Sequence, residues 1–258
     1  MMQEIWIPSS VDGSLQPSLF FHPAPGQTVP MVVGLHTWSF DRFNQRDTYL
    51  PLCKEYGWAL LLPDFRGPNL QTNPNAPLAC GSMTAQRDIF DAIRAVCRDH
   101  AIDRENVFLL GCSGGGHMAL LAAAAQPELF RAVEVWCPVV DLKTWYNKLI
   151  QTPHTYPAHI AACLGGTPEE VPQEYCDRSP ASQAAALAVL PVRMHHGRHD
   201  DLVPFQDTAA LANRIECAGS DQIYPDIFDG GHEQIPAQSF EWFARLAQKH
   251  GAAVTITG

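Results

Sequence analysis

A glycine-rich corner between an apolar strand and an apolar helix constrains this chain more than any other feature. Residues 107–112 are apolar apart from one glycine, and residues 116–125 are rich in alanine and leucine. Between them, Gly111-Cys112-Ser113-Gly114-Gly115 fits the pattern G-x-S-x-G. A chain that turns from strand to helix so abruptly strains the corner residue, and glycines on either side avoid side-chain collisions. The Ser113 hydroxyl should therefore stand at a helix N-terminus, where partial positive charge favours a developing anion.

Length and charge narrow the class of protein. The chain has 258 residues, of which 46% are hydrophobic, so residues 1–258 are expected to form a single α/β domain. The formal net charge of −10 argues against nucleic acid or an anionic membrane as a partner, and no apolar run could span a bilayer. The N-terminus lacks the features of a signal peptide, which predicts a cytoplasmic location unless a leader has been removed. The oligomeric state has no signature in the sequence.

Strand and helix patterns alternate along the chain. Strands are expected in two stretches within residues 3–22, and over 31–36, 58–63, 107–112, 131–136, 191–197 and 222–228. Helices are expected over about 48–57, 82–100, 204–217 and 235–250, and in the alanine- and leucine-rich stretch that follows the glycine corner. This alternation predicts a mostly parallel central sheet of about eight strands with helices on both faces. Active sites in such sheets lie beyond the carboxyl ends of the strands.

The segment 141–180 departs from this alternation. It contains Trp145, Tyr146 and several prolines, and we expect it to be an irregular insertion, either a small cap over the site or an ordinary surface elaboration.

A serine nucleophile needs a base and an acid, and this topology predicts where they fall. His232 follows the last expected strand and is preceded by two glycines that let its loop reach back, so it is the candidate base. The candidate acids are Asp200 and Asp201, which follow the preceding strand; Asp141 is a weaker third choice.

The oxyanion formed during the reaction needs two backbone N–H donors. We expect one from Gly114, directly after the nucleophile. The second should come from the loop after His36, at Trp38.

These motifs together resemble the α/β-hydrolase superfamily, and more narrowly its prolyl-oligopeptidase-like and feruloyl-esterase-like branch. The resemblance rests on Leu35-His36, Asp64-Phe65-Arg66-Gly67, the G-x-S-x-G corner, Gly231-His232, and the run from His196 to Pro204. The family pattern H-G-x-x-D-x-x-V-P implies that the acid is Asp200 and that Asp201 is a spare carboxylate. Thr37 departs from the glycine usual in the oxyanion loop, which leaves the second donor open.

The predicted function is a serine hydrolase with the triad Ser113, Asp200 and His232, acting through an acyl-enzyme on carboxylic esters. No cofactor is expected, and the partner is a small ester or peptide substrate. Trp38, Trp145 and Tyr146 are expected to line the substrate cleft, where aromatic surface would suit an aryl or sugar-linked ester. In the large peptidases of this family a β-propeller selects peptide substrates, and the chain is too short to include one. Its shortness therefore favours ester substrates over peptides.

Three alternatives stay open. The first is a peptidase of the prolyl-oligopeptidase type that acts on small peptides or aminoacyl amides. The second is a metal hydrolase using His195, His196, His199, Asp200 and Asp201, although alternation along a strand would direct His195 and His196 to opposite faces. The third is a non-catalytic binding protein that retains the fold.

Overall fold

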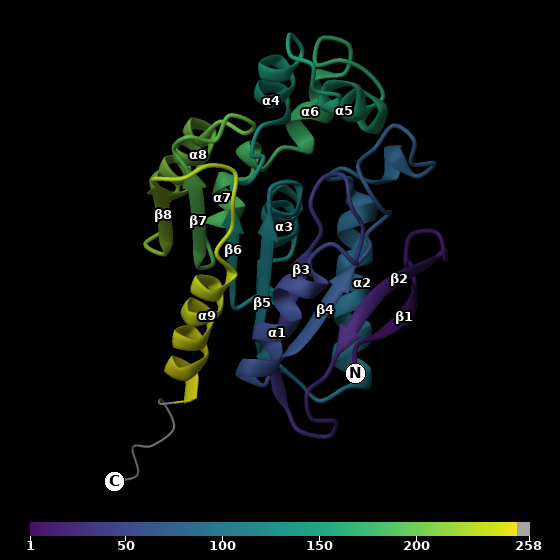
Figure 1. Cartoon of the computed structure of the whole chain (residues 1–258), viewed down its shortest axis with the longest axis vertical. Helices are drawn as coiled ribbons and strands as arrows, with labels where there is room; N and C mark the ends of the chain where they lie inside the picture. Colours follow the sequence, from purple (N-terminus) through teal and green to yellow (C-terminus); the bar gives the residue numbers. More distant parts are fainter. Residues whose placement is uncertain (252–258) are drawn as a thin grey trace.

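A sheet of eight strands runs through the middle of the computed structural model, which describes residues 1–251 (Figure 1). The strands are β1 (Gln3–Pro8), β2 (Leu15–Phe21), β3 (Val29–Leu35), β4 (Ala59–Pro63), β5 (Ile102–Cys112), β6 (Ala132–Trp136), β7 (Val192–Gly197) and β8 (Ile223–Phe228). The α-helices are α1 (Arg46–Tyr56), α2 (Met83–Asp99), α3 (Gly114–Ala125), α4 (Leu142–Leu149), α5 (Tyr156–Leu164), α6 (Pro172–Asp177), α7 (Ala184–Leu187), α8 (Phe205–Cys217) and α9 (Pro236–Gly251). The short 3-10 helices are η1 (Ala76–Leu78), η2 (Pro127–Leu129) and η3 (Pro180–Ser182).

The order of the strands is β1-β2-β4-β3-β5-β6-β7-β8. β1 and β2 form an antiparallel hairpin, and β2 pairs antiparallel with β4. From β4 onward every neighbouring pair is parallel, as the sequence predicts. The carboxyl ends of β3, β5, β6, β7 and β8 therefore meet along one edge of the sheet (Figure 1).

Helices cover both faces of the sheet, and the alternation of side chains along β5 shows why. Val107 and Leu109 pack into a buried cluster with residues of α2, α3 and α8. Phe108 and Leu110 point the other way, into a cluster with residues of α1 and α9. The predicted architecture is thus confirmed. No helix within residues 1–251 is both long enough and apolar enough to cross a bilayer.

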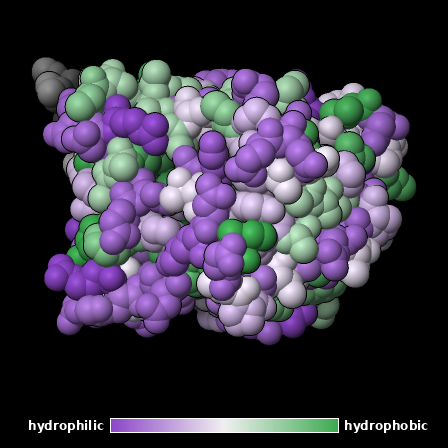
Figure 2. Space-filling view, turned by 90° about the horizontal axis from the view of Figure 1, so that it is seen from above, coloured by the Kyte–Doolittle hydropathy of each residue, from purple (hydrophilic) through white to green (hydrophobic). Residues whose placement is uncertain are grey.

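The insertion 141–180 is more regular than expected, because it contains α4, α5 and α6. In α4, Leu142, Trp145, Tyr146 and Leu149 are buried at helical spacing, and Asp141 caps the helix by accepting from Thr144 N. Two of its prolines, Pro157 and Pro172, lie in the first turns of α5 and α6, where proline is well tolerated. Figure 1 shows these helices beyond the carboxyl ends of the central strands. Viewed from that side, hydrophilic and hydrophobic residues are intermixed on the surface (Figure 2).

A buried ion pair joins the N-terminal hairpin to the rest of the domain. Arg66 follows β4 and is 4% exposed, and its guanidinium donates to Asp88 in α2. It also donates to Asp12 at 2.8 Å and to the Ser9 hydroxyl at 3.0 Å, both in the turn of the hairpin. The Asp88 carboxylate is buried, whereas the Asp12 side chain is 40% exposed. Arg66 thus connects three separate elements through one buried charge.

We expect Asp88→Asn to lower the free energy of unfolding by about 3 kcal/mol, because it leaves the buried Arg66 charge without its buried partner. Urea denaturation monitored by tryptophan fluorescence measures this. Asp99 is the matched control: its pair with Arg98 is exposed, so Asp99→Asn should lower the free energy of unfolding far less. Equal losses in the two variants would show that burial of the Arg66 pair does not matter.

Candidate active site

The strand-to-helix corner has the strained geometry that its glycines predict. Ser113 separates β5 from α3 and has φ 56° and ψ −120°, in a region that L-residues rarely adopt. A Cβ atom at Gly111 would lie 2.2 Å from the Gly115 carbonyl oxygen, and one at Gly115 would lie 2.4 Å from the Leu35 carbonyl oxygen. The backbone at this corner is therefore packed too closely for any other residue at either position.

The structure brings His232 and Asp200 together. Asp200 follows β7 and His232 follows β8, and His232 Nδ1 lies 2.6 Å from Asp200 Oδ2. The other two candidate acids lie elsewhere: Asp201 is exposed, and Asp141 caps α4. Of the three aspartates, Asp200 is the one in contact with this histidine.

Four donors surround the Asp200 carboxylate. Oδ1 accepts from Leu202 N and Val203 N, both at 2.9 Å. Oδ2 accepts from His232 Nδ1 and also faces His196 Nε2 at 3.0 Å. Burial disfavours the charged form, but hydrogen bonds from His196, His232 and Val203 N outweigh it and hold the Asp200 pKa well below its usual range. Asp200 is therefore ionised throughout the pH range in which a histidine titrates.

His196 is fully buried, and its neighbours define where it donates. Nε2 faces two acceptors, Asp200 Oδ2 and the Val203 carbonyl oxygen at 3.1 Å, so Nε2 carries a proton. Nδ1 lies 2.8 Å from the Thr208 hydroxyl oxygen. His196 thus orients the same carboxylate oxygen that contacts His232.

His232 lies in the loop between β8 and α9 (residues 229–235), which we call the His232 loop. This loop contacts the end of β6, the strand next to β5. The Cys137 thiol, just after β6, contacts the carbonyl oxygens of Glu233 at 3.4 Å and Gly231 at 3.6 Å. Ser113 N donates to the carbonyl of Trp136, the last residue of β6, at 2.8 Å. The hydrogen bond that His232 makes within residues 1–251 is the one to Asp200, and Ser113 Oγ makes none there. Ser113 and the His232 loop therefore share the end of β6 without a direct bond between the two side chains.

The His232 loop also packs against the backbone of Gly197 at the end of β7. A Cβ atom at Gly197 would lie 2.2 Å from the Gly231 carbonyl oxygen and 2.3 Å from that of Gly230. A Cβ atom at Gly231 would meet no atom within 4 Å. The absence of a side chain at Gly197 is thus what admits the loop.

We expect Gly197→Ala to lower kcat/KM by about 100-fold, because displacing the His232 loop by an ångström misaligns the base. The control is Gly231→Ala, which adds the same methyl group in the same loop where space is open. Steady-state kinetics on both variants decides the point. Similar activities in the two would mean that the loop adapts to the methyl group.

The two expected oxyanion donors lie side by side. A Cβ atom at Gly114 would be 2.6 Å from Trp38 N, so the backbone of the two residues is in contact. Gly114 is the first residue of α3, where backbone N–H groups have no partner inside the helix. Trp38 N makes no hydrogen bond within the described part of the chain. The role of these two N–H groups as oxyanion donors stays a prediction.

The aromatic residues expected to line the cleft are packed together. Trp38, Trp145 and Tyr146 are 2%, 1% and 8% exposed and belong to one apolar cluster beneath the insertion. The Trp38 and Trp145 rings meet edge to face at 4.8 Å, and Trp145 Nε1 donates to the Leu202 carbonyl oxygen. Their expected contact with substrate stays a prediction.

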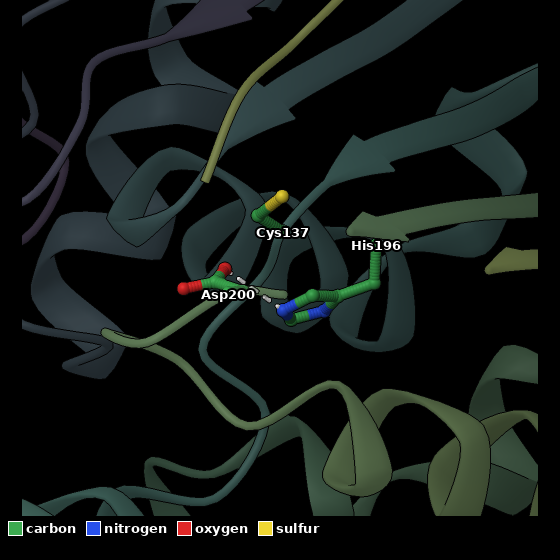
Figure 3. Close-up of side chains that lie close together, drawn as sticks. All are labelled: Cys137, His196 and Asp200. Atoms are coloured by element: carbon green, nitrogen blue, oxygen red, sulfur yellow. Dashed lines mark hydrogen bonds and ion pairs between the residues drawn. The ribbon is translucent and has the colours of Figure 1, made fainter. Parts of the chain in front are cut away.

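The histidine-rich run does not converge on one point. His195 and His196 point to opposite faces of β7, as alternation predicts: His195 contacts Glu134 and Asp226 and stacks on Trp136. His199 pairs with Asp229 at the surface. One possible metal-ligand atom from each of Cys137, His196 and Asp200 does lie within 4.8 Å of the other two (Figure 3).

That cluster suits hydrogen bonding better than metal binding. Burial raises the pKa of the Cys137 thiol to about 11, so the sulfur keeps its proton. His196 Nε2 also carries a proton, and Asp200 already accepts from four donors. A metal ion would have to displace all of these protons and contacts.

Two residues of the site escaped the sequence analysis. Cys137 follows an apolar stretch that indicates only a small buried hydrophobe; it is buried, but it has a positive φ of 44° and its thiol contacts the His232 loop. His196 is a possible metal ligand and the first residue of the H-G-x-x-D-x-x-V-P pattern, but its hydrogen bond to Asp200 was not predicted. Its place directly before Gly197, in the stretch that leads to Asp200, is the signal that could have identified it.

Comparison with known proteins adds independent information. The sequence profile of the prolyl oligopeptidase family matches residues 80–250. The uncharacterized peptidase YtmA of Bacillus subtilis is 26% identical over 51% of this chain and 49% of its own length. A probable dipeptidyl-aminopeptidase B of Talaromyces marneffei is 22% identical over 86% of this chain and 25% of its own. The chain thus spans half or less of the length of these relatives.

Solved structures support the same fold. A puromycin-hydrolyzing peptidase of Mycobacterium tuberculosis superposes with a TM-score of 0.76 at 20% identity, covering 96% of this chain and 40% of that one. An acylaminoacyl peptidase of Pyrococcus horikoshii gives 0.73 at 18% identity, covering 97% and 41%. At these identities the likeness concerns the fold.

Proposed function

The chain belongs to the prolyl oligopeptidase family of serine hydrolases, and on this premise we propose that it is a serine peptidase for small peptides or aminoacyl amides. The expectation of a carboxylic esterase is not confirmed, and the peptidase alternative fits better. The relatives named peptidases and aminopeptidases support this choice. The observation that carries the serine-hydrolase chemistry is the contact of His232 Nδ1 with a four-times hydrogen-bonded Asp200, in a loop that shares the end of β6 with the strained Ser113.

In the proposed reaction, Ser113 Oγ attacks the amide carbonyl carbon while His232 Nε2 takes the hydroxyl proton. Asp200 holds the imidazole through Nδ1 and stabilises its cation. The N–H groups of Trp38 and Gly114 receive the oxyanion, and each such donor contributes roughly 3 kcal/mol to transition-state stabilisation. His232 then gives its proton to the departing amine, and water hydrolyses the acyl-enzyme by the same steps. No cofactor enters this proposal.

The missing Ser113–His232 hydrogen bond is compatible with this role. Catalytic hydrogen bonds in free enzymes are often long and tighten when substrate binds. His232 is anchored through Nδ1 and its side chain is 26% exposed, and Nε2 makes no hydrogen bond within residues 1–251, so the proposal assigns this nitrogen to Ser113. We further propose that α4, α5 and α6 form a cap that limits the site to small substrates.

Matched substrates test the proposal. An aminoacyl p-nitroanilide and the p-nitrophenyl ester of the same acyl group differ only in the bond cleaved, and dipeptidyl anilides and a feruloyl ester extend the series. We expect wild-type enzyme to cleave the anilides, with loss of activity in Ser113→Ala. Cleavage of esters alone would identify an esterase instead. Failure on the whole series, together with no labelling by a fluorophosphonate, would favour a binding protein.

A further inference from the structure

Trp38 lies in the loop between β3 and α1 (residues 36–45), which we call the Trp38 loop. Two glutamine side chains connect this loop to the His232 loop. Gln234 lies two residues after His232, and its Nε2 donates to Gln45 Oε1 at 3.1 Å. Gln45 lies at the end of the loop that follows β3, and its Nε2 donates to Asn44 Oδ1 at 3.1 Å. We call this pair, Gln45 and Gln234, the amide clasp. It spans 189 positions of sequence, so no local pattern announces it.

Further hydrogen bonds connect the clasp to the backbone of the Trp38 loop at one end and to helix α1 at the other. Asn44 Oδ1 also accepts from the backbone N–H of Thr37, the residue before Trp38, at 3.0 Å. At the other end, the hydroxyl of the buried Tyr49 in α1 donates to Gln234 Oε1 at 2.9 Å. Each amide group therefore uses its oxygen to accept and its nitrogen to donate toward Asn44. Hydrogen bonds aligned in this way polarise one another and favour a single geometry.

The side chain of Gln45 does not stabilise the helix that it precedes. It occupies the N-cap position of α1 but makes no capping hydrogen bond to the helix. It is 3% exposed, and burying an amide group is costly unless its hydrogen bonds are satisfied. Here they are satisfied by the Trp38 loop on one side and the His232 loop on the other.

We infer that Gln45 and Gln234 are positioning residues that set the oxyanion donor of Trp38 and the base His232 at their working separation. The inference rests on the proposed serine-hydrolase site and requires only acyl transfer at Ser113, whichever bond is cleaved. Neither glutamine touches the reacting atoms. They act by holding the two loops, each of which supplies one of the groups that must meet a single substrate carbonyl.

The test uses the variants Gln234→Met and Gln45→Met. Each keeps the approximate length of the side chain and removes the hydrogen bonds of its amide group. We expect each to lower kcat by about 10-fold with KM changed less than about twofold, because the misaligned groups act in the transition state. The inhibition constant of a peptide aldehyde, whose serine adduct places an oxyanion at the Trp38 and Gly114 N–H groups, should rise by a similar factor. Rates are taken per active site titrated with a fluorophosphonate, so unfolded protein does not count.

Two controls accompany these variants. Tyr49→Phe removes the terminal hydrogen bond but leaves the clasp intact, and should lower kcat less than about threefold. Gln222→Met changes an exposed glutamine before β8 and should leave kcat unchanged. Should the methionine variants fail to fold, Gln234→Glu keeps the size and the Tyr49 contact but sets a carboxylate against Gln45 Oε1, and the same loss of kcat is expected.

The double variant Gln45→Met/Gln234→Met decides whether the two residues act as one unit. A loss equal to that of either single variant supports the clasp, because breaking one bond twice costs no more than breaking it once. Losses that multiply, or single variants with wild-type kcat and aldehyde affinity, overturn it. If wild-type enzyme cleaves esters but not amides, the proposed peptidase function fails while the clasp is still measured on the ester.

Discussion

Ser113→Ala is expected to lower kcat by at least about 10⁴-fold, the largest effect of any single substitution in this chain. The substitution removes the oxygen that would form the acyl-enzyme, and no other hydroxyl stands at the strained corner between β5 and α3 within residues 1–251. Alanine is no more strained than serine at φ 56°, so the fold should persist. The loss should therefore fall on catalysis and not on stability.

Two measurements verify this loss. Steady-state kinetics on the best substrate gives kcat, and labelling by a fluorophosphonate, which needs the serine oxygen, should disappear. Thermal unfolding should change by no more than a few degrees. Ser10→Ala, at an exposed position in the N-terminal hairpin, is the control and should keep full activity. Activity retained in Ser113→Ala, in protein whose mass excludes wild-type contamination, would remove Ser113 from the mechanism.

Asp200→Asn is expected to lower kcat by about 10⁴-fold, because an amide cannot satisfy four donors. If its NH₂ group faces His232 and His196, it opposes the two imidazole N–H groups. If it faces the other way, it opposes Leu202 N and Val203 N. In the first orientation His232 loses the acceptor that holds its proton on Nδ1, and in the second it keeps only a neutral amide oxygen, which lacks the charge that stabilises the imidazole cation.

The neighbouring carboxylate is the control for Asp200. Asp201 is exposed and its side chain makes no hydrogen bond within the described residues, so Asp201→Asn should change kcat less than about threefold. Steady-state kinetics at pH 7 to 8 compares the two variants. A larger loss in Asp201→Asn would reverse the assignment of the acid.

The same carboxylate should make stability depend on pH. The Asp200 pKa is lower in the folded protein than in an unfolded chain, so its ionised form stabilises the fold fully above about pH 4. That contribution is lost as the pH falls toward the folded-state pKa. Urea denaturation of wild type and Asp200→Asn between pH 7 and pH 3 should show the two stabilities converging on the acid side.

Local sequence determined most of the architecture. The strand over 107–112, the glycines around Ser113 and the helix expected over 82–100 follow from neighbouring residues, and each appears in the structure as expected. The helices of the insertion were missed because prolines that begin a helix and prolines that break one look alike before the helix is known. The aspartate was narrowed to two by topology and assigned to Asp200 by family resemblance.

Tertiary structure alone decided which distant polar groups meet. The strand order places Asp200 and His232 in contact across 32 residues. The thiol of Cys137 and the Gln45–Gln234 amide pair join positions that are 96 and 189 residues apart. Sequence determines secondary structure through neighbours, since steric limits and hydrophobic period act over a few residues. Polar contacts across the sheet depend on how buried groups satisfy their hydrogen bonds once the chain is packed, and many sequences with the same periodicity would satisfy them differently.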